Sequence, residues 1–188
     1  IGPEDWAFEQ ALHTRAPWRA AQAMRHWRIG YNAGGPHKYT DTTATNPQFR
    51  IRVPSGNHEK AHIVVAVAQN YECYRSRNEE ESEIGFSIYQ IPHNMPRLTS
   101  QFVSENDPLD VAPLTRIREI ATFFALPPGD FVVLPHTLQH REGKFLLRIF
   151  ADQHADVWEV NEDNMIIPNA AIDFPEDRLH DAVTFYCY

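Results

Sequence analysis

Clusters of carboxylates are the residues of this sequence whose types and spacing could do chemistry, because calcium in proteins is held by six to eight oxygen atoms, several of them from carboxylates. The candidate calcium ligands are Glu105, Asp107 and Asp110 in one run, and Glu79, Glu80 and Glu81, followed by Glu83, in another. A further candidate set is Asp152 and Asp156 with Glu162 and Asp163. Arg75 and Arg77 stand beside the second run, so it equally fits a solvated charged loop. No Asp-x-Asp-x-Asp-Gly pattern occurs, so no EF-hand is expected. Calcium is the one cofactor that the sequence suggests.

The two cysteines are the candidate nucleophiles. The nucleophile of a papain-like cysteine protease is a thiolate at a helix N-terminus, paired with a histidine that an asparagine orients. The local sequence signature of such a nucleophile has Gln a few residues ahead of the Cys and Trp directly after it. Cys73 lies in Tyr71-Glu-Cys-Tyr-Arg75, which has neither feature, and Cys187 is the penultimate residue. We therefore expect no catalytic residue in this chain.

A histidine pair, His136-x-x-x-His140, raises the question of zinc. Two histidines four residues apart bind zinc in metalloproteases when they lie on a helix beside a catalytic Glu. Here the pair lies in the connection of a predicted hairpin, without that helix or Glu. We expect loop or surface histidines.

The elements that must position these residues are strands. Two runs rich in β-branched and aromatic residues, Phe131–Leu134 and Phe145–Phe150, flank a polar connection that ends in Glu142-Gly143-Lys144. Pro128-Gly129 before the first run is a turn signal. The second run alternates between inward and outward side chains. The pattern predicts a long antiparallel hairpin with one face in a core.

Other runs repeat this character along the chain. The candidate strands are Trp27–Gly35, Asn46–Val53, Ala61–Ala68, Ile84–Ile91, Asp156–Val160 and Val183–Cys187, with weaker runs at Phe102-Val103 and Arg116–Phe124. About eight strands with short loops and no alternation of strand and helix indicate an all-β fold, an antiparallel sandwich. The first 24 residues have a loose helical spacing and predict a short helical lead-in. We therefore divide the chain into a lead-in (1–24), a sandwich (25–160) and an acidic extension (161–188) that could end in a last strand.

Composition and charge exclude several classes of protein. The chain has 188 residues, enough for one domain, and a formal net charge of −8. An acidic body without a basic stripe argues against nucleic acid and against unaided adhesion to anionic lipid. No apolar run approaches the roughly 20 residues that span a bilayer. Two cysteines are too few for a disulfide scaffold, so we expect a reduced, cytoplasmic protein.

Five blocks in a fixed order carry a resemblance to a known family. They are Trp27-Arg-Ile-Gly-x-x-Ala-Gly-Gly35, Thr45-Asn-Pro-Gln-Phe49, Ile84-Gly-Phe-Ser-Ile-Tyr89, Leu126-Pro-Pro-Gly-Asp-Phe-Val-Val-Leu-Pro135 and Glu142-Gly-Lys-Phe-Leu-Leu-Arg-Ile-Phe150. Each block is weak alone, and the ordered set is specific. It resembles the C2-like domain, domain III, that follows the protease core in calpains. The resemblance implies an eight-stranded antiparallel β-sandwich related to C2 domains.

The same resemblance implies a function. In calpains this domain is non-catalytic, packs on the cysteine protease core, and is implicated in calcium response and phospholipid contact. The expected partner is therefore a calpain protease core or another protein, with phospholipid bound only in the presence of calcium. The competing reading is a stand-alone module that binds a protein or a membrane without an attached protease.

One departure from the family bears on this function. Well-known calpains carry a long acidic loop after the Asn-Pro-Gln strand, whereas Val53–Lys60 here holds one acid and one lysine. The basic run often found before the Ile-Gly-Phe strand is reduced to Arg75 and Arg77. A switch based on charge between this domain and a protease core is therefore not expected to work in the usual way.

Overall fold

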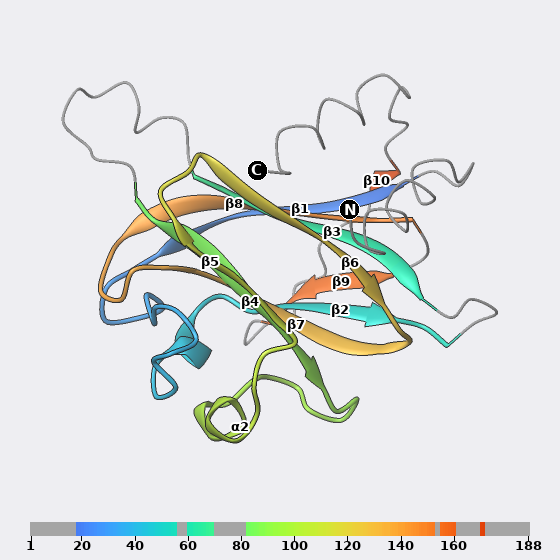
Figure 1. Cartoon of the computed structure of the whole chain (residues 1–188), viewed down its shortest axis with the longest axis horizontal. Coiled ribbons are helices and arrows are strands. Elements are labelled where there is room, and N and C mark those ends of the chain that lie inside the picture. The colour runs from blue at the N-terminus through green and yellow to red at the C-terminus, as the bar shows by residue number, and fades with distance from the viewer. Residues whose placement is uncertain (1–17, 56–59, 70–81, 153–154, 161–169, 172–188) are drawn as a thin grey trace, which may run out of the picture.

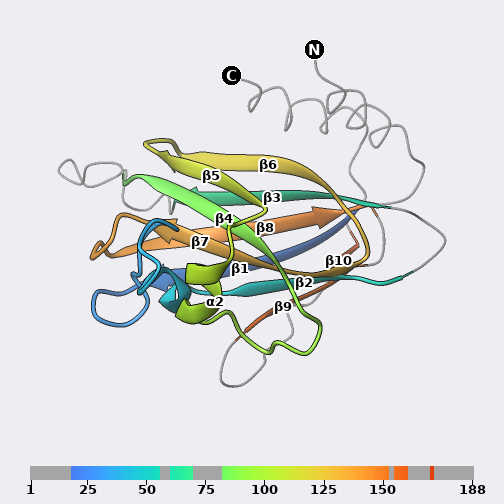
Figure 2. The same ribbon diagram turned by 60° about the horizontal axis from the view of Figure 1, so that its bottom comes forward.

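The computed structural model describes residues 18–55, 60–69, 82–152, 155–160 and 170–171. Within them, ten strands form two five-stranded antiparallel sheets packed face to face (Figures 1 and 2). The predicted all-β antiparallel sandwich is thereby confirmed. The number of strands differs from the predicted eight, because nine strands of four or more residues and one strand of two residues are present in the described part.

Each sheet draws its strands from along the chain. The first sheet has the order β10-β1-β8-β3-β6, formed by Ala170–Ala171, Arg19–Trp27, Gly143–Ala151, Ala61–Gln69 and Glu119–Leu126. The second has the order β5-β4-β7-β2-β9, formed by Asp110–Thr115, Ile84–Ile91, Gly129–Thr137, Phe49–Val53 and Asp156–Glu159. A 3₁₀ turn, η1 (Thr43–Thr45), and a helix, α2 (Ser100–Glu105), complete the described elements. No helix of these residues is long and apolar enough to cross a membrane.

The core lies between the two sheets, where alternate residues of each strand point inward. At its centre the rings of Trp27 and Phe145 stack with centroids 4.2 Å apart, and Phe49 meets Phe145 edge-on at 6.4 Å. Aromatic pairs of this kind add about 1 kcal/mol each beyond the burial of their surface. The indole Nε1 of Trp27 donates a hydrogen bond of 3.1 Å to the carbonyl of Pro135, so the buried N–H group of this side chain is satisfied.

The predicted hairpin between Phe131–Leu134 and Phe145–Phe150 is wrong. The first run lies in β7, which pairs with β4 and β2, and the second lies in β8, which pairs with β1 and β3. The two strands therefore belong to different sheets, and residues 138–142 cross the thickness of the sandwich. Alternation reveals which side chains point inward, but it does not reveal which strand lies alongside.

The predicted helical character of residues 18–24 is also wrong, because Arg19–Trp27 is strand β1; residues 1–17 lie outside the described part. Alanine favours helices in isolation, but β1 pairs with β8 along its whole length. Ala21 and Ala23 are buried in the core between the sheets. The sandwich therefore starts before residue 25.

Three further predictions need adjustment. Trp27 ends β1 and the residues after it turn, with the amide of Ala33 bonded to the carbonyl of Arg28, so Trp27–Gly35 is not a strand. Phe102-Val103 lies in α2, which Thr99 caps by accepting a hydrogen bond from the Phe102 amide. Ala170–Ala171 joins β1, so part of the C-terminal extension belongs to the first sheet, whereas the Val183–Cys187 run lies outside the described residues.

Candidate functional site

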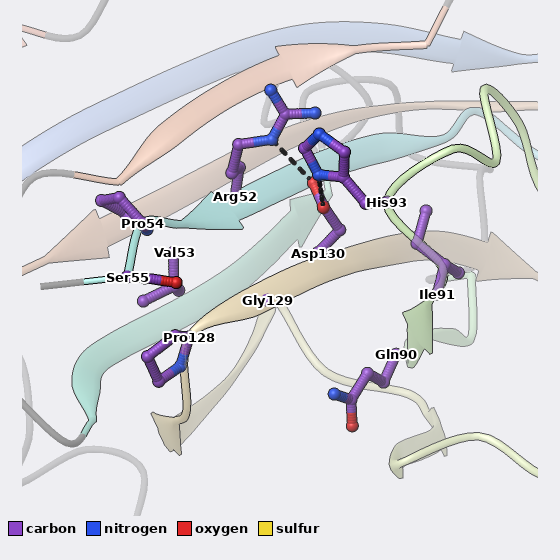
Figure 3. A pocket seen from close by; sticks show the side chains of 10 residues that line it. All are labelled: Arg52, Val53, Pro54, Ser55, Gln90, Ile91, His93, Pro128, Gly129 and Asp130. Atoms are coloured by element: carbon purple, nitrogen blue, oxygen red, sulfur yellow. Dashed lines mark hydrogen bonds and ion pairs between the residues drawn. The ribbon is translucent and has the colours of Figure 1, made fainter.

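A pocket of about 260 Å³ opens where β2 and β4 end and β7 begins (Figure 3). Its polar lining consists of Arg52, Ser55, Gln90, His93 and Asp130. The remaining walls are apolar or backbone and include two prolines, Pro54 and Pro128. Strand pairing creates this meeting place, because β7 aligns Gly129 with Val53 of β2 and Asp130 with Ile91 of β4.

A single buried carboxylate organises the pocket. Asp130 is 4% exposed, and its Oδ1 accepts hydrogen bonds from Nε of Arg50 (3.0 Å) and Nε of Arg52 (2.9 Å). Its Oδ2 lies 2.6 Å from Nδ1 of His93. Burial alone would raise the pKa of Asp130, but the hydrogen bonds from Arg52, Arg50 and His93 outweigh it and hold that pKa below its usual value. The ionised carboxylate can only accept, so Nδ1 of His93 carries the proton of this bond.

The two arginines have different roles. Arg50 is buried, and its Nη1 and Nη2 donate to the carbonyls of Met95 (2.6 Å) and His93 (2.8 Å). These two bonds fasten the loop between β4 and α2 to the sheet. The side chain of Arg52 is 35% exposed and lies 5.0 Å from the ring of Trp158. Arg50 is therefore structural, whereas Arg52 faces the pocket and the solvent (Figure 3).

At the other end of β7, the loop between β1 and β2 is fixed by Asn46. Its Oδ1 accepts from the Gly34 amide (3.1 Å), and its Nδ2 donates to the carbonyls of Gly35 (2.8 Å) and Thr43 (2.9 Å). A Cβ on Gly34 would lie 2.0 Å from the carbonyl oxygen of Thr42, so only glycine fits there. Two of the sequence blocks, Trp27–Gly35 and Thr45–Phe49, thus meet to build one rigid loop.

Four large apolar side chains are exposed at this end, which we name the apolar end: Ile29 (55%), Tyr31 (74%), Tyr39 (37%) and Leu138 (36%). Three come from the β1–β2 loop and Leu138 from the β7–β8 connection. The two segments are joined by a hydrogen bond from the amide of His140 to the carbonyl of Ala33 (3.3 Å) and by one from Gln139 Nε2 to Thr42 Oγ1 (3.1 Å). The apolar end is therefore an ordered surface rather than a set of separate loops.

The histidine pair separates in the structure. His140 lies in the turn after β7 and is exposed, as expected, whereas His136 is fully buried within β7, so its predicted surface position is wrong. Neither ring nitrogen of His136 forms a hydrogen bond of ordinary geometry with the described residues. Burial lowers the pKa of His136 to about 4; the Leu134 backbone acts in the opposite direction and His37 lowers it further. Such a histidine is neutral at physiological pH.

Comparison with known proteins decides the family. Residues 23–150, well over half of the chain, match the family described as calpain large subunit, domain III. The chain belongs to the calpain domain III family. The family resemblance carried by the five sequence blocks is thereby confirmed.

Individual calpains show the same relationship. The chain is 28% identical over 87% of its length to the calpain-2 catalytic subunit of Bos taurus and 31% identical over 82% to the calpain-1 catalytic subunit of Sus scrofa. It is 32% identical over 72% of its length to calpain clp-1 of Caenorhabditis elegans. The matches cover 25%, 24% and 18% of those proteins, so the chain spans about a quarter or less of the relatives it matches. Domain III is a non-catalytic domain of calpains, which are cysteine proteases.

The candidate calcium ligands of this domain III are only partly described. Glu105 ends α2 and accepts a hydrogen bond from Gln101, and Asp110 begins β5 and accepts one from the Val111 amide. Asp107 is exposed between them. Among the described residues no three His, Cys, Asp or Glu side chains come close enough to hold a metal ion, so these acids are not gathered into a cluster. Calcium binding stays a prediction, since Glu79, Glu80 and Glu81 lie outside the described part.

Sequence reasoning missed the cluster around Asp130. The outward direction of Arg50 and Arg52 on their strand was predictable from the alternation of Phe49, Ile51 and Val53, but the burial of Arg50 was not. The signal that could have located the cluster is a lone acid at the start of an apolar strand. Both cysteines, Cys73 and Cys187, lie outside the described residues.

Proposed function

We propose that this domain III positions and restrains an attached calpain-type cysteine protease core through protein contacts and carries out no catalysis itself. The family and its place in calpain catalytic subunits support the proposal. The relatives are about four times as long as the chain, so a protease core attached to it is the natural occupant of a docking surface. We propose a cytoplasmic setting for the same assembly.

The observation that carries the proposal is the apolar end. Exposed aromatic and aliphatic side chains on a fixed loop are what protein interfaces use as anchors, since each buries a large area. The hydrogen bonds of Asn46 hold the β1–β2 loop in place before any partner arrives. Less conformational entropy is therefore lost when Tyr31 and Ile29 become buried.

A binding experiment with matched variants tests the docking surface. The 188-residue chain and the protease core of the same gene product would be mixed, and their association measured by calorimetry. Tyr31→Ser and Ile29→Ser should each weaken association roughly tenfold, because each removes an anchor of about 1–2 kcal/mol. Leu109→Ser is the control, since Leu109 is 51% exposed but directly precedes β5, where its amide bonds to the carbonyl of Ile88 in β4. Equal weakening by the control, or no complex at all, would refute docking through this end.

Calcium and phospholipid sensing are finer parts of the proposal. Carboxylates of Glu105, Asp107 and Asp110, with those of residues 79–81, would supply the oxygen atoms that calcium requires. Calorimetry with millimolar calcium should then show heat and a raised melting temperature. Sedimentation with anionic vesicles should show binding only when calcium is present. A flat titration with unchanged melting would remove the calcium role, and with it the calcium-dependent contact with lipid.

A further inference from the structure

The pocket at the start of β7 has hydrogen-bond donors that no described residue uses. Asp130 accepts from Arg50, Arg52 and His93, so the carboxylate is already occupied. Arg52 uses only its Nε in this contact, and His93 uses only its Nδ1. Within the described residues, no hydrogen bond involves either Nη atom of Arg52 or the Nε2 of His93. With its proton on Nδ1, the neutral imidazole presents Nε2 as an acceptor, so the unused donors of the pocket are the two Nη groups of Arg52.

Both side chains are also held in position. Asp130 is buried and lies between them, so its two carboxylate oxygens fix the guanidinium on one side and the imidazole on the other (Figure 3). Arg50 fixes the backbone that carries His93 by donating to its carbonyl. Trp158 lies against the guanidinium of Arg52 at 5.0 Å. A ligand that meets polar groups already in place loses less entropy on binding than one that must order them.

The geometry points to a binding site for a phosphate monoester, such as the phosphorylated side chain of a serine in a partner peptide. The fork of an arginine binds phosphate oxygens through paired, charge-assisted hydrogen bonds. A tetrahedral phosphate has enough oxygens to accept from both Nη atoms of Arg52 and, when both ring nitrogens of His93 carry protons, from its Nε2.

A single phosphate fits this chain better than a membrane surface does. The chain has a formal net charge of −8, which opposes approach to an anionic bilayer. A phosphate on a short side chain responds mainly to charges within a Debye length, about 8 Å at physiological salt. The ionisable groups that line the pocket are Arg52, His93 and Asp130, with Arg50 and Asp156 beside them, and the carboxylate of Asp130 is paired. The volume of the pocket, about 260 Å³, also suits a single side chain, and the pocket is open to solvent at His93, whose side chain is 75% exposed.

The imidazole of His93 gives the site a signature. Its Nε2 is a donor only when both ring nitrogens carry protons. The surrounding charged groups are Asp130 on β7, Arg50 and Arg52 on β2, and Asp156, which lies opposite Arg52 on β9. Sulfate is a useful probe because it stays a dianion between pH 6 and pH 8, so any pH dependence of its binding comes from the protein.

The test is calorimetry of the 188-residue chain with O-phosphoserine, and with sulfate at pH 8 and pH 6. Sulfate should bind more tightly at pH 6, and His93→Gln should abolish this difference. Arg52→Gln should weaken binding of O-phosphoserine roughly tenfold or more, because paired charge-assisted bonds are lost. Arg97→Gln is the matched control, since Arg97 is exposed on the loop that carries His93 and does not line the pocket.

Several outcomes would overturn the proposal. They are no binding of O-phosphoserine, equal weakening by Arg97→Gln, and sedimentation with anionic vesicles that depends on Arg52 while O-phosphoserine does not bind. Melting curves of each variant show whether it is folded. Should Arg52→Gln fail to fold, Arg52→Lys keeps the charge and removes the fork, and it must still weaken binding. Unchanged binding in Arg52→Lys would then count against the site.

Discussion

Replacing His136 with leucine should flatten the pH dependence of domain stability between pH 6.5 and pH 4. The pKa of His136 is lowered from 6.5 to about 4 in the folded protein, chiefly by burial. Between those two values the unfolded chain binds a proton that the folded protein does not. The free energy of unfolding therefore falls as the pH is lowered through this window and becomes level below about pH 4.

The size of the effect follows from the shift. Each unit of pKa difference corresponds to about 1.4 kcal/mol, so a shift from 6.5 to about 4 amounts to about 3 kcal/mol lost between neutral pH and pH 4. Asp130 does not act in this window, because its lowered pKa places its loss of stability below pH 3.8. A fall of this size is a large part of the stability of a typical domain.

Urea unfolding followed by tryptophan fluorescence at pH 7.5, 6, 5 and 4.5 measures the effect. His136→Leu can lower stability at every pH through imperfect packing, so the readout is the slope against pH and not the absolute value. His140→Asn is the control, because His140 is exposed and asparagine tolerates its positive φ of 59°. The same slope in His136→Leu as in the unsubstituted chain would refute the assignment to His136.

Three other substitutions test how the sandwich is held. Asp130→Ala should cost about 4 kcal/mol, since it leaves the buried Arg50 without its carboxylate, and urea unfolding would show it. Phe145→Ala should cost about 4 kcal/mol in the same assay because it opens a cavity beside Trp27. Gly34→Ala should cost about 2 kcal/mol or more by calorimetric melting, because its Cβ would overlap the Thr42 carbonyl, whereas Gly143→Ala, with 3.7 Å of space, should be nearly neutral.

Elements with a clear alternation of side chains could be predicted from the sequence. Ile84–Ile91 is a strand with the predicted bounds, and Ala61–Ala68 differs from β3 by one residue. Both runs combine β-branched residues with apolar side chains that enter the core, so local preference and burial agree. β1 was missed because its alanines fit a helix as well as a strand, and only pairing with β8 decides between them.

The pocket could not be predicted for a different reason. Asp130 and His93 are 37 positions apart, and they meet only because β4 and β7 pair with Ile91 opposite Asp130. Arg52 joins them through the separate pairing of β2 with β7. Periodicity shows which face a residue occupies but carries no information on strand order. A site assembled across three strands therefore becomes visible only once the order of the sheet is known.

The route of the chain between β7 and β8 explains how the two segments of the apolar end are joined. In the predicted hairpin, residues 138–142 would have turned within one sheet. In the structure they cross from the second sheet to the first, over the end of the sandwich, and the amide of His140 bonds to the carbonyl of Ala33. The crossing thereby joins the segment that carries Leu138 to the loop that carries Tyr31 and Ile29. A partner that docks there contacts segments rooted in both sheets, so it can resist their movement relative to each other.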